Sequence, residues 1–308
     1  MMKYLLYGLL FLWSSTWMFG QQNPQYTQYM YNTQVINPAY TASKESFSAG
    51  LLYRTQWVGL DGAPKTATFS ADTPLGRYEN MGLGINISHD EIGPSNKTIA
   101  TINYAYEIDI AANAKLSFGV NAGVDVLNVD FRKLNIYYPD DPYFQENIDN
   151  RWQPQIGAGI YYYTNRFYAG LSVPNLLETK HFESSESFQA VAAERMHYYL
   201  IAGYVFDLNY AVKFKPATML KAVEGAPLQW DVSANFLFHE KFTLGAAYRW
   251  DASVSALAGF QINNNWFIGV GYDYQLTNLE KYSDGSYEII LKFELFNPRK
   301  SILTPRFF

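Results

Sequence analysis

Short stretches in which apolar and polar residues alternate are the feature that most constrains how this chain folds. In NMGLGINIS, residues 80–88, Met, Leu and Ile alternate with Asn, Gly and Ser. PLQWDVSANF, residues 227–236, and YEIILKFEL, residues 287–295, repeat the pattern with few exceptions. Because successive side chains of an extended strand point to opposite faces, this period of two predicts β-strands with one apolar face and one polar face.

The composition of the two faces indicates a membrane rather than water around the sheet. The polar face is rich in Gly, Ser, Asn and single charges, and the apolar face often ends in Trp, Tyr or Phe, as an interfacial girdle requires. Aromatic residues make up 18% of the chain and charged residues 17%, against about 25% charged residues in soluble domains. Lipid cannot satisfy backbone amides, so a sheet within it must close. The sequence therefore predicts an all-β fold, a transmembrane antiparallel β-barrel in the lipid bilayer.

The alternating stretches divide the chain into a barrel with two flanking segments. They number about 14, and bacterial single-chain barrels have an even number of strands. The barrel is expected to span residues 46–296, preceded by a short N-terminal segment at 21–45 and followed by a C-terminal tail at 297–308. Strands are predicted at residues 46–57, 65–73, 79–90, 98–109, 115–127, 155–164, 166–173, 196–206, 211–222, 228–238, 241–250, 253–262, 265–275 and 285–296.

The connections between these strands alternate in length. With a periplasmic N-terminus, the inner turns are mostly tiny, and the outer loops include long ones at residues 128–154 and 174–195. The same register turns mostly polar and small residues into the lumen, with charges of both signs. This argues against a selective ion pore and favours a narrow or plugged lumen laced by ion pairs. The predicted lumen charges are Arg54, Glu107, Asp125, Lys213, Lys215, Lys221, Asp231, Arg249, Asp273, Lys292 and Glu294.

The first residues, MMKYLLYGLLFLWSSTWMFG, predict that the protein is exported. One Lys, an apolar run and a small residue before Gln21 indicate a cleaved signal peptide at residues 1–20, and the alternative is an N-terminal anchor that stays in place. The chain has no Cys, so we expect neither disulfides nor a lipidated thiol. Export and the barrel pattern together predict the outer membrane. The net charge of −5 gives no basic surface for nucleic acid.

No pattern of catalytic or metal-ligating residues stands out in the sequence. None of the four histidines has a partner His at metal-ligand spacing, and no Ser–His constellation can be assembled from neighbours. The loop that contains Asp140, Asp141, Glu146 and Asp149 is acidic, but its spacing is not that of an EF-hand, so a solvated loop is favoured over a calcium site. We therefore predict no enzyme activity, no metal and no cofactor.

The N-terminal segment contains QYTQYMYNTQVINPAY, residues 25–40, which has many Tyr, Gln and Asn residues and no charge. It is too polar for a core strand, and its ring faces and amides suit packing inside a mixed lumen or under its floor. Because the segment precedes the first strand, we expect it to start on the periplasmic side. We predict a plug or a periplasmic partner contact, with plain strand initiation as the alternative. The candidate residues are Tyr26, Tyr29, Tyr31, Asn37, Pro38 and Tyr40.

The C-terminal tail, within NPRKSILTPRFF, continues beyond the last predicted strand. It either turns back into the lumen or touches a periplasmic partner. Arg306, Phe307 and Phe308 are its candidate contact residues.

Several stretches, in order along nearly the whole mature chain, resemble the PorP/SprF family of outer-membrane proteins associated with type IX secretion and gliding motility. The opening NPQYTQYMYNTQVINPAYTAS is similar to that family's N-terminal signature, although Thr41-Ala42 stands where Ala-Gly is more usual. Further matching stretches are YRTQWVGLDGAPKTATFSADTPL, KLSFGVNAGVDVLNVDF, YYYTNRFYAGLSVPNLLE, LAGFQINNNWFIGVGYDY and the terminal PRFF.

The resemblance implies a noncatalytic barrel that receives or anchors a type IX cargo at the cell surface. The implied partner is a secreted adhesin or another cargo, bound through its C-terminal domain, and a periplasmic peptidoglycan-binding protein is a further implied partner. A role in secretion, in gliding or in both stays open. The candidate extracellular contacts with the cargo are Trp57, Asp61, Tyr138, Asp140, Asp141, Leu176 and Leu177.

The main alternative is an outer-membrane transporter of small hydrophobic molecules, because such barrels share the strand number and an N-terminal plug. It needs an apolar cavity in the lumen, whereas the predicted register places mostly polar and small residues there. A passive porin and a barrel lipase are disfavoured by the mixed lumen charges and by the missing Ser–His pairing.

Overall fold

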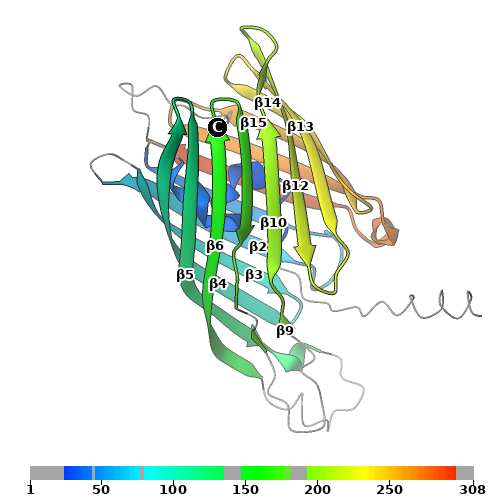
Figure 1. The fold of residues 1–308 in the computed structure, drawn as a ribbon. Helices are drawn as coiled ribbons and strands as arrows, with labels where there is room; N and C mark the ends of the chain where they lie inside the picture. The colour runs from blue at the N-terminus through cyan, green and yellow to red at the C-terminus, as the bar shows by residue number, and fades with distance from the viewer. Residues whose placement is uncertain are drawn as a thin grey trace, which may run out of the picture.

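The chain forms a closed antiparallel β-barrel (Figure 1). The computed structural model describes residues 24–43, 46–76, 80–134, 147–177, 179–180 and 193–295. Within these ranges, fourteen strands pair in chain order around the wall, and β1 closes the barrel by pairing with both β2 and β17. The predicted barrel of about 14 strands is confirmed. No helix in the described part of the chain is long and apolar enough to cross a membrane.

The wall strands differ in length. They are β1 (Ser48–Thr55), β2 (Lys65–Leu75), β3 (Met81–Ile92), β4 (Ser95–Ala111), β5 (Ala114–Val129), β6 (Ile148–Thr164), β7 (Phe167–Val173), β10 (His197–Tyr204), β12 (Val212–Val223), β13 (Gln229–Phe238), β14 (Phe242–Arg249), β15 (Ser253–Gln261), β16 (Trp266–Gln275) and β17 (Ser286–Glu294). The short strands β8 (Thr179–Lys180) and β9 (Ala193–Glu194) pair with each other, and β11 (Phe206–Asp207) extends the sheet beside β12.

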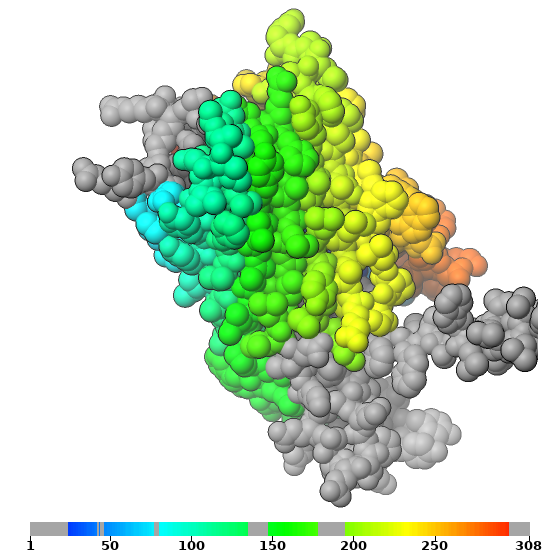
Figure 2. All heavy atoms as spheres, in the orientation of Figure 1, coloured from blue at the N-terminus to red at the C-terminus, as the bar shows by residue number. Residues whose placement is uncertain are grey.

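The period of two separates the two faces of the wall as the sequence predicts. On β1, Leu51 is 56% exposed while Arg54 is 1% exposed, and on β4, Ile102 is 59% exposed while Asn103 is fully buried. Because the exposed face is apolar and the sheet has no open edge, the exterior suits lipid. Figure 2 shows the face of this wall that contains β5, β6, β7, β10 and β12, which follow one another in that order.

The strands β5 and β6 reach farther into the long outer loop than predicted. β5 continues to Val129 and β6 begins at Ile148, whereas the alternating pattern predicts a loop over residues 128–154. Pairing continues because a bulge shifts the register between Leu127 and Val129, and the Asn128 side chain accepts a hydrogen bond of 2.7 Å from the Asn150 amide. At the same end of the barrel, β3 and β4 are joined by a two-residue turn.

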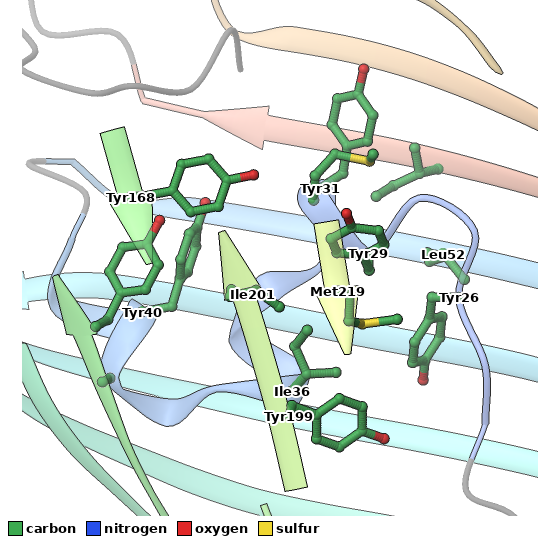
Figure 3. Packing of buried hydrophobic residues seen from close by; sticks show 14 of the residues in the cluster. Tyr26, Tyr29, Tyr31, Ile36, Tyr40, Leu52, Tyr168, Tyr199, Ile201 and Met219 are labelled. Carbon is green, nitrogen blue, oxygen red and sulfur yellow. The ribbon is translucent and has the colours of Figure 1, made fainter. Parts of the chain in front are cut away.

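Residues 24–43, called the inner segment from here on, lie inside the barrel (Figures 1 and 3). The segment folds into the short helices η1 (Tyr29–Tyr31), α2 (Thr33–Ile36) and η2 (Pro38–Ala42). Asn37 caps η2 by accepting a hydrogen bond from the Ala39 amide, and Pro38 stands at the first turn, where its missing N–H is harmless. The segment therefore satisfies part of its backbone locally, without joining the sheet.

The inner segment runs along the lumen from one end of the barrel to the other. Thr27 lies level with Arg54, near the end of β1 that leads into the loop at residues 56–64. Ala39 lies level with Ser117 and Gly119, near the start of β5 and the short turn before it. The sequence predicts that the segment starts on the side of the short turns. Its last residues lie on that side instead, and its first described residues lie toward the opposite end.

Candidate functional site

A buried ion network lies where the inner segment meets β1, β16 and β17. Arg54 Nη2 is 2.7 Å from Asp273 Oδ2, and Arg54 Nη1 is 3.2 Å from Glu288 Oε2. The amides of Thr27 and Gln28 donate to the two oxygens of Glu288 at 3.0 and 2.8 Å, and the Thr27 hydroxyl donates to Asp273. Buried charges are tolerated only when they are paired and hydrogen-bonded. The inner segment supplies hydrogen bonds that the buried carboxylates of the barrel need.

A second ion pair holds the start of the inner segment. Arg249 of β14 makes a two-pronged contact with Asp231 of β13, with N–O distances of 2.8 and 3.0 Å. Its third nitrogen, Nη1, donates to the Gln25 side-chain carbonyl at 2.9 Å, and Nη2 also approaches the Tyr26 carbonyl at 3.5 Å. The planar guanidinium can serve the carboxylate and the segment together because its donors are fixed in a fork.

The tyrosines of the inner segment occupy separate places on the lumen wall (Figure 3). The Tyr26 hydroxyl is 2.9 Å from Thr68 Oγ1 of β2. The Tyr31 ring stacks on Phe267 of β16 with centroids 4.8 Å apart, and the Lys292 ammonium lies 5.9 Å from the Tyr31 centroid. Tyr26 thus buries a large apolar ring while its hydroxyl keeps a polar partner.

Glycines of the wall leave room for the second half of the inner segment. A Cβ at Gly119 would lie 2.2 Å from the Ala39 nitrogen, and one at Gly159 would lie 2.2 Å from Asn37 Oδ1. Such distances are below any real contact, so a side chain at either position would displace the segment. These glycines belong to β5 and β6, and they allow the backbone of the segment to approach the sheet closely.

Hydrogen bonds fix the same half of the segment to the wall. Ser117 Oγ donates to the Ala39 carbonyl at 2.7 Å, and Ser172 Oγ donates to the Ile36 carbonyl at 2.6 Å. Asn37 Nδ2 donates to the Ile160 carbonyl at 3.1 Å. Most of these bonds end on main-chain atoms of the segment, so its fold and its position are set together.

All six candidate residues of the N-terminal segment come together inside the lumen. Each of them is buried: Tyr26, Tyr29, Tyr31, Asn37, Pro38 and Tyr40. Tyr40 packs edge-on against Tyr161 of β6 at a centroid distance of 5.5 Å. The sequence signals that identify them are the high density of Tyr and Asn and the position directly before the first strand.

The candidate contacts with the cargo lie at the loop-bearing end or outside the described residues. In the loop after β1, the Trp57 amide donates to the Ser286 hydroxyl at 3.1 Å and Asp61 is exposed. After β7, Leu176 is 42% exposed and its amide donates to the Ile156 carbonyl, while Leu177 is half-buried. The remaining candidates lie outside the described residues: Tyr138, Asp140, Asp141, Arg306, Phe307 and Phe308.

An exposed ion pair marks the first turn of the long outer loop. Just beyond β5, Arg132 Nε donates to Asp130 Oδ1 at 2.8 Å. These hydrogen bonds lower the pKa of the Asp130 carboxyl below its ordinary value, and Asp130 raises the pKa of Arg132. Because both groups face water, the pair organises the turn more than it stabilises the fold.

The lumen charges lie largely as predicted, and among the described residues three buried carboxylates are added to the predicted set, Asp72, Asp90 and Glu288. Glu288 is buried at the centre of the ion network but is missing from the predicted set. Its position opposite Tyr287 and Ile289 on an alternating strand is the signal that identifies it. Eight of the predicted charges are buried and three are half-buried, the latter being Lys213, Arg249 and Glu294.

The lumen is less polar than predicted. Large apolar and aromatic side chains also point inward and pack against the inner segment, because the segment brings its own apolar surface into the barrel. These residues interrupt the small and polar face of their strands, which is the only sequence signal they leave. They are Leu52, Tyr161, Tyr163, Tyr168, Tyr199, Ile201, Met219, Leu257, Phe267 and Ile290.

Among the described residues, no group of three His, Cys, Asp or Glu side chains is arranged to hold a metal ion. Of the acidic loop, Asp140, Asp141 and Glu146 lie outside the described residues.

Comparisons with known proteins return a family model and several solved structures. The family model described as type IX secretion system membrane protein PorP/SprF matches residues 18–293. Similar solved structures include the CymD monoaromatic hydrocarbon channel, with 11% identity, a TM-score of 0.49, and coverage of 89% of this chain and 93% of that chain. The P. putida toluene transporter TodX shows 8% identity, a TM-score of 0.49, and coverage of 86% and 94%. A Pseudomonas aeruginosa FadL homologue shows 11% identity, a TM-score of 0.47, and coverage of 90% and 95%. No curated protein matches the chain.

Proposed function

This chain belongs to the PorP/SprF family of type IX secretion system membrane proteins, and from that membership we propose that it is a noncatalytic outer-membrane barrel that receives or anchors a type IX cargo. The cargo is a surface adhesin or another exported protein, held through its C-terminal domain, and the role supports secretion, gliding or both. In this proposal residues 1–20 are a signal peptide that is removed on export.

The family match carries the proposal, and the filled lumen supports it. The inner segment occupies the lumen and is bonded to strands on opposite sides of the wall, among them β2, β5, β7, β16 and β17. An occupied lumen favours a holding function over free passage of solutes. The barrel thus offers its two rims, rather than an open channel, for contact with partners.

The loop-bearing rim is the surface we assign to the cargo. It carries the exposed Asp61 and Leu176, close to Trp57 and Leu177 in the same loops. Tyr138, Asp140 and Asp141 are assigned to the same contact from the sequence. On the opposite rim, a periplasmic peptidoglycan-binding protein is the proposed partner, with Arg306, Phe307 and Phe308 as proposed tail contacts. Deleting residues 299–308 is then expected to abolish partner function while the barrel stays heat-modifiable.

Affinity purification tests the proposal. The tagged barrel is extracted from its native outer membrane in mild detergent, and the co-purifying proteins are identified. We expect a large exported protein or its C-terminal domain. The double variant Asp61→Ala/Leu176→Ala should recover less of it, whereas Tyr210→Ala, at a fully exposed position in the turn at the opposite rim, should recover as much as the unchanged protein. Recovery of the barrel alone, with bound lipid or single-channel conductance, would contradict the proposal.

The alternative of a transporter for small hydrophobic molecules is not favoured by the lumen pocket. This pocket lies between the inner segment and β3 to β6, and its cavity of about 50 Å³ is partly open to solvent. Amides and hydroxyls of Asn86, Ser88, Thr101, Asn121 and Gln155 line it together with apolar side chains. A hydrocarbon would leave those polar groups without partners, so the lining does not single out an apolar ligand.

A further inference from the structure

The two parts of the inner segment are held in different ways. Residues 25–32 are held mainly by charged side chains of β1, β14, β16 and β17, although the Tyr26 hydroxyl also reaches β2. Residues 33–43 are held by carbonyls, serines and glycines of β2, β5, β6 and β7. The second part is also joined directly to β1. Residues 25–32 contact the wall by non-covalent bonds, and along the chain they are joined to β1 through residues 33–43.

The charged half of the lumen recognises features that any uncharged peptide can offer. Glu288 accepts hydrogen bonds from two successive backbone amides, and Asp273 accepts one from a threonine hydroxyl. Arg249 donates to a glutamine side-chain carbonyl and approaches the next backbone carbonyl. None of these groups needs a charge on the segment. The half-lumen therefore has the chemistry of a peptide-binding groove.

The positions of the enclosed tyrosine rings set the spacing that a ligand of this groove must match. Tyr26, Tyr29 and Tyr31 are 5%, 3% and 6% exposed, so each ring is enclosed by the wall or the rest of the segment. Phe267 stacks on Tyr31, and Lys292 lies over the same ring. Enclosed rings contribute most of the contact area of such an interface. A ligand of this groove must carry tyrosines at matching intervals.

The position of residues 25–32 makes exchange geometrically simple. Their contacts with Arg54, Arg249 and Asp273 lie toward the ends of β1, β14 and β16 that lead into the loop-bearing rim. This is the rim that we assign to the cargo. A peptide that approaches there meets residues 25–32 before it meets the glycine-lined half of the lumen.

We propose that the half-lumen lined by Arg54, Asp231, Arg249, Asp273 and Glu288 is a peptide-binding site, which residues 25–32 occupy in the resting protein. Its ligand is an extended, uncharged, tyrosine-bearing segment of the exported partner, which enters by exchange with residues 25–32. This inference rests on the proposed function, since it names the chemistry by which the barrel holds its cargo.

A disulfide across the groove tests the exchange. An ideal Cβ at Gly271 lies 3.7 Å from Gln28 Cγ, so Gln28→Cys/Gly271→Cys brings two sulfurs within bonding reach. The chain has no other cysteine, so the bond is unambiguous and can be opened by a reductant. The probe is a fluorescent synthetic peptide, PQYTQYMYNTQ, with the sequence of residues 24–34. The matched control peptide has Ser at its three Tyr positions.

Binding of the probe to the full-length barrel in detergent is measured by fluorescence anisotropy. We expect the reduced double-cysteine protein to bind the probe and not the control peptide, and the oxidised protein to bind neither. Thr27→Val removes a hydroxyl that donates to Asp273, which weakens the competing segment and should tighten probe binding about tenfold. Glu288→Gln removes a charged acceptor that the resident segment and the probe share, so it should change probe binding less than Thr27→Val does. Thr27→Val keeps the test valid if the Glu288→Gln variant folds poorly.

Equal binding to the oxidised and reduced proteins, or no binding to the reduced protein and to Thr27→Val, would overturn the exchange. Cargo capture separates this outcome from a failure of the proposed function. If the oxidised double-cysteine protein captures as much cargo as the reduced protein, the anchor role stands and the peptide-binding site is ruled out. If the unmodified barrel captures no cargo, the proposed anchor role is wrong, whether or not the probe peptide binds.

Discussion

At the scale of single residues, Arg54 is the cation that pairs with both carboxylates of the buried ion network. Its guanidinium faces two carboxylates, Asp273 and Glu288, and all three side chains are at most 1% exposed. A buried pair contributes little net stability, but removal of one partner leaves the other charge uncompensated. The network also bonds the inner segment, so its loss affects both the wall and the lumen filling.

The variant Arg54→Met should therefore destabilise the barrel by about 3–5 kcal/mol. The measurement is the temperature at which the heat-modifiable barrel unfolds in detergent. Arg132→Met is the matched control, because its ion pair with Asp130 lies at the surface with the Arg132 side chain 80% exposed, and its midpoint should not move. Equal midpoints for the two variants would show that the buried network does not hold the fold.

Gly119 is a wall residue at which the position of the inner segment depends on the absence of a side chain. Gly119→Ala would place a Cβ 2.2 Å from the Ala39 nitrogen, so the inner segment must shift, at a cost of about 1–3 kcal/mol. Gly50→Ala is the control, since its Cβ would meet a side-chain oxygen of Ser70 at 3.3 Å. Denaturant midpoints of the two variants make the comparison. A larger loss at Gly50 would contradict the assigned close approach.

At the scale of elements, the inner segment and the strands obey different rules. The strands follow the period of two and turn an apolar face to lipid. The inner segment has no such period and folds into three single-turn helices, with Asn37 as the cap of η2. Some of its polar side chains find partners far away in sequence, such as Thr27 with Asp273 and Tyr26 with Thr68.

The enclosure of the inner segment predicts how a cysteine in it reacts. Tyr29 is 3% exposed, whereas Tyr210, in the turn that includes β11, is fully exposed. A cysteine at position 29 should stay unlabelled by a bulky water-soluble thiol reagent under conditions that label a cysteine at position 210 completely. The labelled fraction is read from a mass or mobility shift. Rapid labelling at position 29 would mean that the segment does not stay in the lumen.

At the scale of the whole molecule, the barrel wall and its filling form two separable parts. The wall closes through β1 and β17 without any contribution from residues 24–43. The filling is built around a buried cluster that includes Tyr29, Met30, Ile36 and Tyr40. A barrel with this arrangement is expected to conduct poorly while the segment is in place.

Deletion of residues 24–32 should open the lumen without opening the wall. Single-channel recordings in planar bilayers are expected to show a clear increase in conductance over the unchanged protein, while heat modifiability persists. The variant Arg132→Met serves as a recording control that leaves the lumen intact. If the deletion variant conducts no more than this control, the remaining residues or the loops close the barrel by themselves.

The sequence by itself determines the closed β-barrel, the approximate strands and the lumen side of most charges, because the alternation is local and each strand reports its own two faces. The resemblance in the same residues identifies the PorP/SprF family, which the family match confirms. The density of Tyr, Gln and Asn points to residues 25–40 as candidates for lumen packing. It says nothing about their direction or partners.

Only the tertiary structure decides how the lumen is assembled. The pairing of Arg54 with Asp273 and Glu288 joins residues more than 200 positions apart, and no local pattern encodes such a contact. The extension of β5 and β6 depends on a bulge near Asn128 that interrupts the alternation. Inward apolar residues such as Leu52 and Ile201 are favourable only because the inner segment covers them. Packing between distant parts of the chain sets these features, and the period of two records only the local faces of each strand.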